Sequence, residues 1–144
     1  MRTLPVIAAL IAALVLAAPA GAAVKRLEAN LRGSDSTDAD GRGTAKLRLN
    51  RARERVCFTI TVRRIDDVVA AHIHAGGPGV DGSIVVDLIT APESGNRFTG
   101  CTEDVAKSTI RRILRRPRRY YVNVHTVDFP GGAVRGQLRK PPEG

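Results

Sequence analysis

The chain has 144 residues, of which 43% are hydrophobic and only 3% aromatic, and its formal net charge at pH 7 is +9. A chain of this length fits one domain with a single hydrophobic core. The positive charge is compatible with an anionic partner, such as a cell-surface polymer or phospholipid headgroups. The scarcity of aromatic side chains argues against nucleic acid as the partner, because single-stranded nucleic acid is held largely by stacking.

The first predicted element is a secretory signal peptide, residues 1–23. An arginine precedes an apolar run from Leu4 to Ala18, and small residues with an Ala-Gly-Ala step follow this run. The run is too short for a stable membrane span, so we expect it to be cleaved off. The mature chain, residues 24–144, is therefore expected to lie outside the cytoplasm, in the periplasm or at the cell surface, with no membrane-spanning segment.

Alternation of apolar and polar residues predicts β-strands along most of the mature chain. In residues 44–50, Ala45, Leu47 and Leu49 alternate with polar side chains, and residues 56–62 repeat the pattern. This period of two is typical of half-buried strands in an antiparallel sheet. After an entry strand within residues 24–43, the predicted strands are 44–50, 56–62, 68–75, 83–89, 120–127 and 133–139.

One segment predicts an α-helix instead, over residues 103–115. Ala106, Ile110 and Ile113 recur there at helical spacing. Thr102 is suited to cap the start of this helix, and arginines fill its last turn. The predicted fold class is therefore mainly β: an antiparallel β-sandwich or partly open Greek-key barrel with one amphipathic helix before the last hairpin.

The chain has two cysteines, Cys57 and Cys101. In an oxidising compartment, a single pair of this kind in a small domain predicts one disulfide bond. The alternative is two buried thiols. A redox-active pair is not expected, because the Cys-x-x-Cys spacing that lowers a thiol pKa is absent from the sequence.

The chain has three histidines, and the strand pattern places all of them on predicted strands. His72 and His74 share one face of the strand 68–75, and His125 lies on the strand 120–127. If these strands are neighbours, three imidazoles converge and are suited to hold a copper or zinc ion. The alternative is a metal-free polar cluster in which the same side chains hydrogen-bond to backbone groups of the glycine-rich turns.

Other polar side chains are predicted to support this cluster. Tyr121 and Asn123 share the strand face that carries the third histidine. Asp87 or Asp128 is a candidate fourth ligand, or a partner that orients an imidazole. Arg135 is predicted to pair with one of these aspartates or to line the histidine pocket.

Arginine is concentrated in the stretch RRILRRPRR, which begins inside the predicted helix. Such a stretch is a candidate surface for an anionic partner. The alternative is that its guanidinium groups are only solvated. The arginines of this stretch are Arg111, Arg112, Arg115, Arg116, Arg118 and Arg119.

The blocks AHIHAGGPGVDGSIVVDL and YYVNVHTVDFPGGAVRGQL resemble the CHRD domain, a module found as repeats in chordin and singly in secreted bacterial proteins. Cys57 before Phe58, and Cys101 after Gly100, are similar to the cysteine positions of the bacterial members. The resemblance spans nearly all of the mature chain and implies a secreted single-domain module. The arginine-rich stretch departs from the family, whose helix usually carries a mixture of residues.

The His-x-His strand is also similar, more weakly, to copper/zinc superoxide dismutases, but their two-metal site needs more histidines than the three present. The sequence shows no nucleophile turn or paired-carboxylate motif of a hydrolase, so we expect no enzymatic activity. The first functional hypothesis is a secreted non-catalytic module that binds a protein or an anionic cell-surface polymer. The alternative is a copper- or zinc-binding protein with a metal-handling or redox role.

Overall fold

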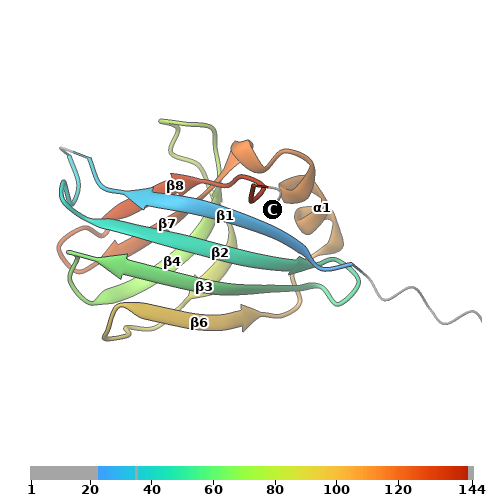
Figure 1. Ribbon diagram of the computed structural model, residues 1–144, viewed down its shortest axis with the longest axis horizontal. Helices are drawn as coiled ribbons and strands as arrows, with labels where there is room; N and C mark the ends of the chain where they lie inside the picture. Colours follow the sequence, from blue (N-terminus) through green and yellow to red (C-terminus); the bar gives the residue numbers. More distant parts are fainter. Residues whose placement is uncertain (1–22, 35, 143–144) are drawn as a thin grey trace, which may run out of the picture.

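The computed structural model describes residues 23–34 and 36–142, so the predicted signal peptide lies outside the described residues except for Ala23. Within these ranges, eight strands, one α-helix and one short 3-10 helix follow the chain in order (Figure 1). Their bounds are β1 (Lys25–Arg32), β2 (Arg42–Asn50), β3 (Arg55–Arg63), β4 (Val68–Ala75), β5 (Ile84–Ile89), β6 (Arg97–Thr102), α1 (Lys107–Arg115), η1 (Pro117–Arg119), β7 (Tyr120–Thr126) and β8 (Val134–Gln137).

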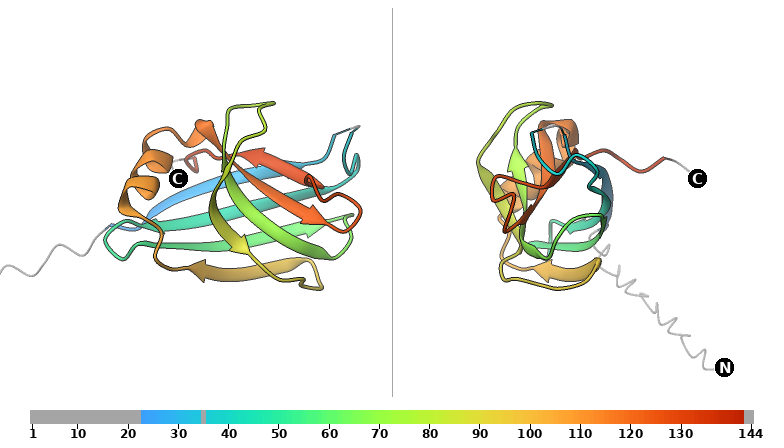
Figure 2. Two further views of the ribbon diagram at one scale, coloured as in Figure 1. Left: turned by 180° about the vertical axis from the view of Figure 1, so that it is seen from behind. Right: turned by 90° about the vertical axis from the view of Figure 1, so that its left-hand side faces the viewer.

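All eight strands belong to one sheet, and every neighbouring pair in it is antiparallel. Their order across the sheet is β5-β4-β7-β8-β1-β2-β3-β6. The sheet curls until its two edge strands, β5 and β6, approach each other, so the molecule is a nearly closed barrel (Figure 2). The predicted class, mainly antiparallel β with one helix, is confirmed.

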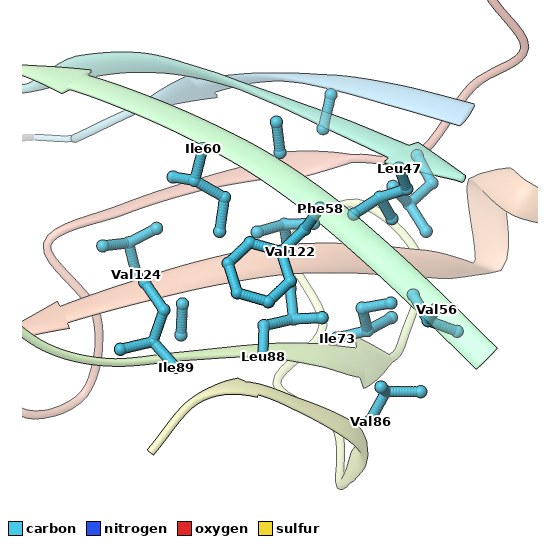
Figure 3. Packing of buried hydrophobic residues seen from close by; sticks show 14 of the residues in the cluster. Leu47, Val56, Phe58, Ile60, Ile73, Val86, Leu88, Ile89, Val122 and Val124 are labelled. Atoms are coloured by element: carbon cyan, nitrogen blue, oxygen red, sulfur yellow. The ribbon is translucent and has the colours of Figure 1, made fainter. Parts of the chain in front are cut away.

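The interior of the barrel is filled by the apolar side chains that alternate along each strand. Phe58 and Ile60 of β3 face Ile73 of β4 and Val122 of β7 across the interior, and all four are buried (Figure 3). Complete burial of a side chain of this size stabilises the fold by about 1.5–3 kcal/mol. Because neighbouring residues of a strand point to opposite faces, the polar residues of β4 and β7 lie on the outside of the barrel.

The strands that alternation predicts are present, and their ends differ from the prediction by at most two residues. Alternation does not predict β6, because its only buried side chain is Phe98. This strand is held by its pairing with β3, in which Cys101 lies opposite Cys57. The two cysteines form the predicted disulfide bond.

The predicted start of the helix is wrong. α1 begins at Lys107 rather than at residue 103, and its N-cap, Ala106, makes no side-chain capping bond. Thr102 instead ends β6, where its hydroxyl donates a hydrogen bond to the Asp87 carbonyl of β5. Asp104 has a φ of 57°. This left-handed conformation interrupts a right-handed helix, so α1 can begin only after it.

α1 covers one end of the barrel (Figure 1). Ile110 and Ile113 are fully buried against the core, and Arg112 and Arg115 lie in the last turn of the helix, as the sequence predicts. Positive side chains are favoured there because the carbonyl end of a helix carries partial negative charge. Among the described residues, no helix is long and apolar enough to cross a membrane.

Candidate metal centre

The three histidines lie together on the outward face of β4 and β7, which are neighbouring strands of the barrel. His72 and His74 are two residues apart on β4, and His125 lies on β7. We call these three residues the histidine cluster. Two loops adjoin it: the β4–β5 loop, residues 76–83, and the β7–β8 loop, residues 127–133.

The imidazoles of the histidine cluster are close enough to share one ion. Each offers one nitrogen within 4.8 Å of the others, and in the described part of the chain no Cys, Asp or Glu joins the group. Nδ1 of His72 lies 3.1 Å from Nε2 of His125. With metal–nitrogen bonds of about 2.0–2.1 Å, this separation corresponds to a ligand–metal–ligand angle of about 100°. A pair 4.8 Å apart has to move closer, because two such bonds span about 4.1 Å at most.

Backbone carbonyls fix the orientation of two of the imidazoles. Nδ1 of His74 lies 2.8 Å from the carbonyl oxygen of Gly82, and Nδ1 of His125 lies 2.8 Å from that of Pro130. A carbonyl oxygen only accepts hydrogen bonds, so Nδ1 of each histidine carries the proton. In the neutral ring, Nε2 then carries the lone pair that an ion would bind.

Nε2 of His74 is buried and has no hydrogen-bond partner. His74 as a whole residue is only 8% exposed. An unsatisfied polar atom in such a place costs about 1–3 kcal/mol. A purely structural polar cluster would pair this nitrogen, whereas a metal site requires it to be free.

The imidazole of His72 faces a carboxylate on the side away from His125. Nε2 of His72 lies 3.7 Å from Oδ1 of Asp87, whose side chain is 60% exposed. Asp87 thus lies on the far side of the ring from His125, where it can orient His72 but cannot complete the group of ligands. The structure does not bring Asp128 to the cluster. Asp128 is exposed in the β7–β8 loop and lines a surface hollow with Phe129 and Pro130.

Tyr121 and Arg135 pack beside the cluster. The Tyr121 ring stacks on His74, with centroids 5.0 Å apart, and the Arg135 guanidinium lies 3.7 Å from the centroid of the Tyr121 ring. Arg135 donates to Oδ1 of Asp81 at 2.7 Å and to the Val80 carbonyl at 2.8 Å. The pairing predicted with Asp87 or Asp128 is therefore wrong, since the partner of Arg135 is on the β4–β5 loop.

Asn123 supports the other loop. Its side-chain Nδ2 donates to the Gly131 carbonyl at 3.0 Å, and its Oδ1 is buried without a partner. The loop passes so close that a Cβ on Gly132 would lie 2.2 Å from Oδ1 of Asn123. The sequence predicts hydrogen bonds from these side chains to backbone groups of the glycine-rich turns, but it does not identify the Gly82 and Pro130 carbonyls as the acceptors, because the alternation of a strand says nothing about the path of a loop.

Burial favours the neutral form of two of the imidazoles, His72 and His125. Desolvation is the main cause that lowers the pKa of His72, and the neighbouring His125 lowers it further, while Asp87 opposes the shift. Desolvation also lowers the pKa of His125, against the hydrogen bond to Pro130. Both rings are therefore neutral at pH 7, which is the protonation state that a metal ligand needs.

Comparison with known proteins identifies the family of the chain. The family model of the CHRD domain matches residues 27–138, a range that contains the histidine cluster and both cysteines. Searches of curated proteins and of solved structures gave no match. Because the matched range covers most of the chain, the protein belongs to the CHRD domain family.

Proposed function

We propose that this CHRD-domain protein is exported and binds one copper or zinc ion through His72, His74 and His125. The observation that carries the proposal is the buried, unpaired Nε2 of His74 inside a group of three imidazole nitrogens. Imidazole suits zinc and copper, whereas calcium and magnesium prefer oxygen ligands. Three protein ligands leave a fourth position open to water or to an external ligand.

Binding of the ion requires one proton to move. In the metal-free neutral cluster, Nδ1 of His72 donates to Nε2 of His125, because that nitrogen is an acceptor. An ion between these nitrogens replaces this proton. The Nε2–H tautomer of His72 then points toward Asp87, whose carboxylate stabilises it.

The proposed role is metal handling outside the cytoplasm, without catalysis. Export would expose the site to both ions, and the Cys57–Cys101 disulfide is compatible with an oxidising compartment. Export is tested by the mass of the protein recovered from the periplasm or the medium after expression of the full chain. Loss of residues 1–23 supports it, and an intact chain in the cytoplasm contradicts it.

The metal site is tested by titrating the purified protein with Cu²⁺ and with Zn²⁺ at pH 7.5. We expect one ion per chain, and we expect His74→Ala to weaken its affinity at least tenfold, since loss even of an outer partner of a ligand typically costs that much. A protein that binds neither ion, or whose affinity is unchanged in His74→Ala, would contradict the proposal.

A pair of aspartates provides a matched control. Asp87→Asn removes the negative charge that faces His72, so it should weaken binding, whereas Asp128→Asn makes the same change of charge outside the cluster and should not. Equal effects of the two substitutions would show that only the net charge of the surface matters.

A further inference from the structure

The end of the barrel that α1 covers is strongly positive. The segment from Lys107 to Arg119 contains no Asp or Glu. Its six arginines are all exposed, and none of them forms an ion pair with a carboxylate of the described residues. These residues, which we call the α1 arginines, are Arg111, Arg112, Arg115, Arg116, Arg118 and Arg119.

The α1 arginines other than Arg118 border two surface hollows beside the helix. The first lies between α1 and the β4–β5 loop, and its lining includes Gly76, Gly77, Arg112, Arg115, Arg116 and Arg119. The second lies between α1 and the start of the chain's described part, and its lining includes Lys25, Arg51, Arg111, Leu114 and Arg115.

Arg115 lines both hollows, so their positive charges form one continuous band across α1. The spacing of the sequence explains the division. Arg111 and Arg112 are about 100° apart around the helix and line different hollows, and Arg115 lies between these two directions. A band of this shape can hold several anionic groups in a row, not only one.

The stability of the helix does not explain the whole set of α1 arginines, because only Arg111, Arg112 and Arg115 lie within α1. The partial negative charge at the carbonyl end favours cations only in the last turn, which contains Arg112 and Arg115. Like charges four residues apart destabilise a helix by a few tenths of a kcal/mol per pair. A bound anion removes this repulsion, and the guanidinium group is suited to hold phosphate oxygens in pairs.

The exposed side of α1 also argues for a polymer over a bilayer. Ile110 and Ile113, the apolar residues of its buried face, are fully covered by the core. The side turned to solvent is almost entirely basic and polar, so it offers little that would insert among acyl chains.

We propose that the basic band across α1 binds a linear extracellular polymer that carries repeated phosphate groups. This inference is independent of the metal site, because it rests on α1 and its neighbours and on none of the histidines. The polymer lies across the helix at Arg115 and places phosphate groups in both hollows.

The test uses inorganic polyphosphate as the probe and the purified protein in EDTA, so that the histidine cluster is empty. We expect binding at low salt whose affinity falls steeply as the salt concentration rises. The double variant Arg112→Glu/Arg115→Glu should bind at least tenfold more weakly. Arg63→Glu/Arg97→Glu is the control, since it makes the same change of charge at exposed positions of β3 and β6 at the opposite end of the barrel (Figure 1). Circular dichroism confirms that both variants are folded.

Three results would overturn the proposal. The first is absence of binding at low salt. The second is an equal loss in the control variant, which would show that net charge alone holds the polymer. The third is tighter binding to phosphatidylglycerol vesicles than to polyphosphate with the same dependence on Arg112 and Arg115, which would make the partner a membrane surface.

Discussion

At the scale of single residues, His74 is the side chain whose surroundings best separate a metal ligand from a structural histidine. One ring nitrogen is tied to the Gly82 carbonyl and one face of the ring is covered by Tyr121. The other ring nitrogen is buried and unpaired. A ring held so firmly, with one nitrogen left free, is in the state that a metal ligand needs before the ion arrives.

The lowered pKa values of His72 and His125 predict how the metal-free protein responds to acid. The unfolded chain takes up protons near pH 6.5, whereas the buried rings resist protonation to a lower pH. Their contribution to stability is therefore complete above about pH 6.5 and is lost as the pH falls from there through the folded pKa values. We expect the free energy of unfolding, measured with urea in EDTA, to decrease as the pH is lowered from 7.5 to 5.5.

His72→Gln is the comparison for this measurement, because it removes one titrating group at the cluster. Its stability should depend less on pH than that of the unchanged protein. A free energy of unfolding that stays constant or rises toward pH 5.5 would contradict the prediction. With metal present, affinity should fall over the same range, since protons and the ion compete for the same lone pairs.

At the scale of elements, the site consists of two regular strands and two irregular loops, and these differ in how far the sequence predicts them. A period of two is enough to place His72 and His74 on one face of β4, and Tyr121 and Asn123 beside His125 on β7. It also finds every strand with an alternating buried face. β6 lacks such a face, and the start of α1 is decided by the conformation of Asp104, which no periodicity encodes.

The loops are predicted only in part, for a different reason. Backbone groups of the glycine-rich turns are expected to bind the cluster, but every residue has a carbonyl, so the sequence does not show which ones do. The path of the β4–β5 loop also decides a side-chain contact, since Arg135 donates to Oδ1 of Asp81 only because the loop returns over the barrel. The aspartates that the sequence offers as partners, Asp87 and Asp128, are nearer to recognisable strands but do not reach this arginine.

The β7–β8 loop gives a prediction at this scale. Gly132 has a φ of +126°, and a side chain there would collide with Asn123. Gly132→Ala should therefore displace the loop, destabilise the protein by about 1–3 kcal/mol and weaken metal binding through the loosened Pro130 carbonyl. Gly131→Ala is the control, because a Cβ at Gly131 meets open space. Thermal unfolding and metal titration of both variants check the prediction, which is wrong if the two behave alike.

At the scale of the whole molecule, the barrel separates the two proposed functions. The histidine cluster lies on the outward face of β4 and β7, while the basic band lies over the end that α1 covers. The β4–β5 loop takes part in both, since Gly82 orients His74 and Gly76 lines the hollow beside the helix. The same apolar core supports both the histidine cluster and α1, but its side chains belong to neither proposed site.

The disulfide bond should contribute strongly to the stability of the barrel. Cys57 and Cys101 are 44 residues apart, and the bond closes the chain between them into a loop. For a loop of that length the chain-entropy model gives a stabilisation of about 4 kcal/mol. Cys57→Ser/Cys101→Ser should lower the free energy of urea unfolding by a few kcal/mol. A loss below about 1 kcal/mol, or two reactive thiols in the unfolded, non-reduced protein, would contradict this prediction.

The incomplete closure of the barrel gives the disulfide a second consequence, for how copies of the protein meet. β5 and β6 are the edges of the sheet, and a free edge presents unpaired N–H and C=O groups that can accept a strand from another molecule. β6 is held by its pairing with β3, by one buried side chain, Phe98, and by the Cys57–Cys101 bond, so reduction of that bond would weaken its attachment. If β6 detaches, β3 with its continuous apolar face becomes the new edge. We therefore expect reduced protein to aggregate under conditions in which it is not yet globally unfolded. In this way the disulfide bond also protects the protein against aggregation.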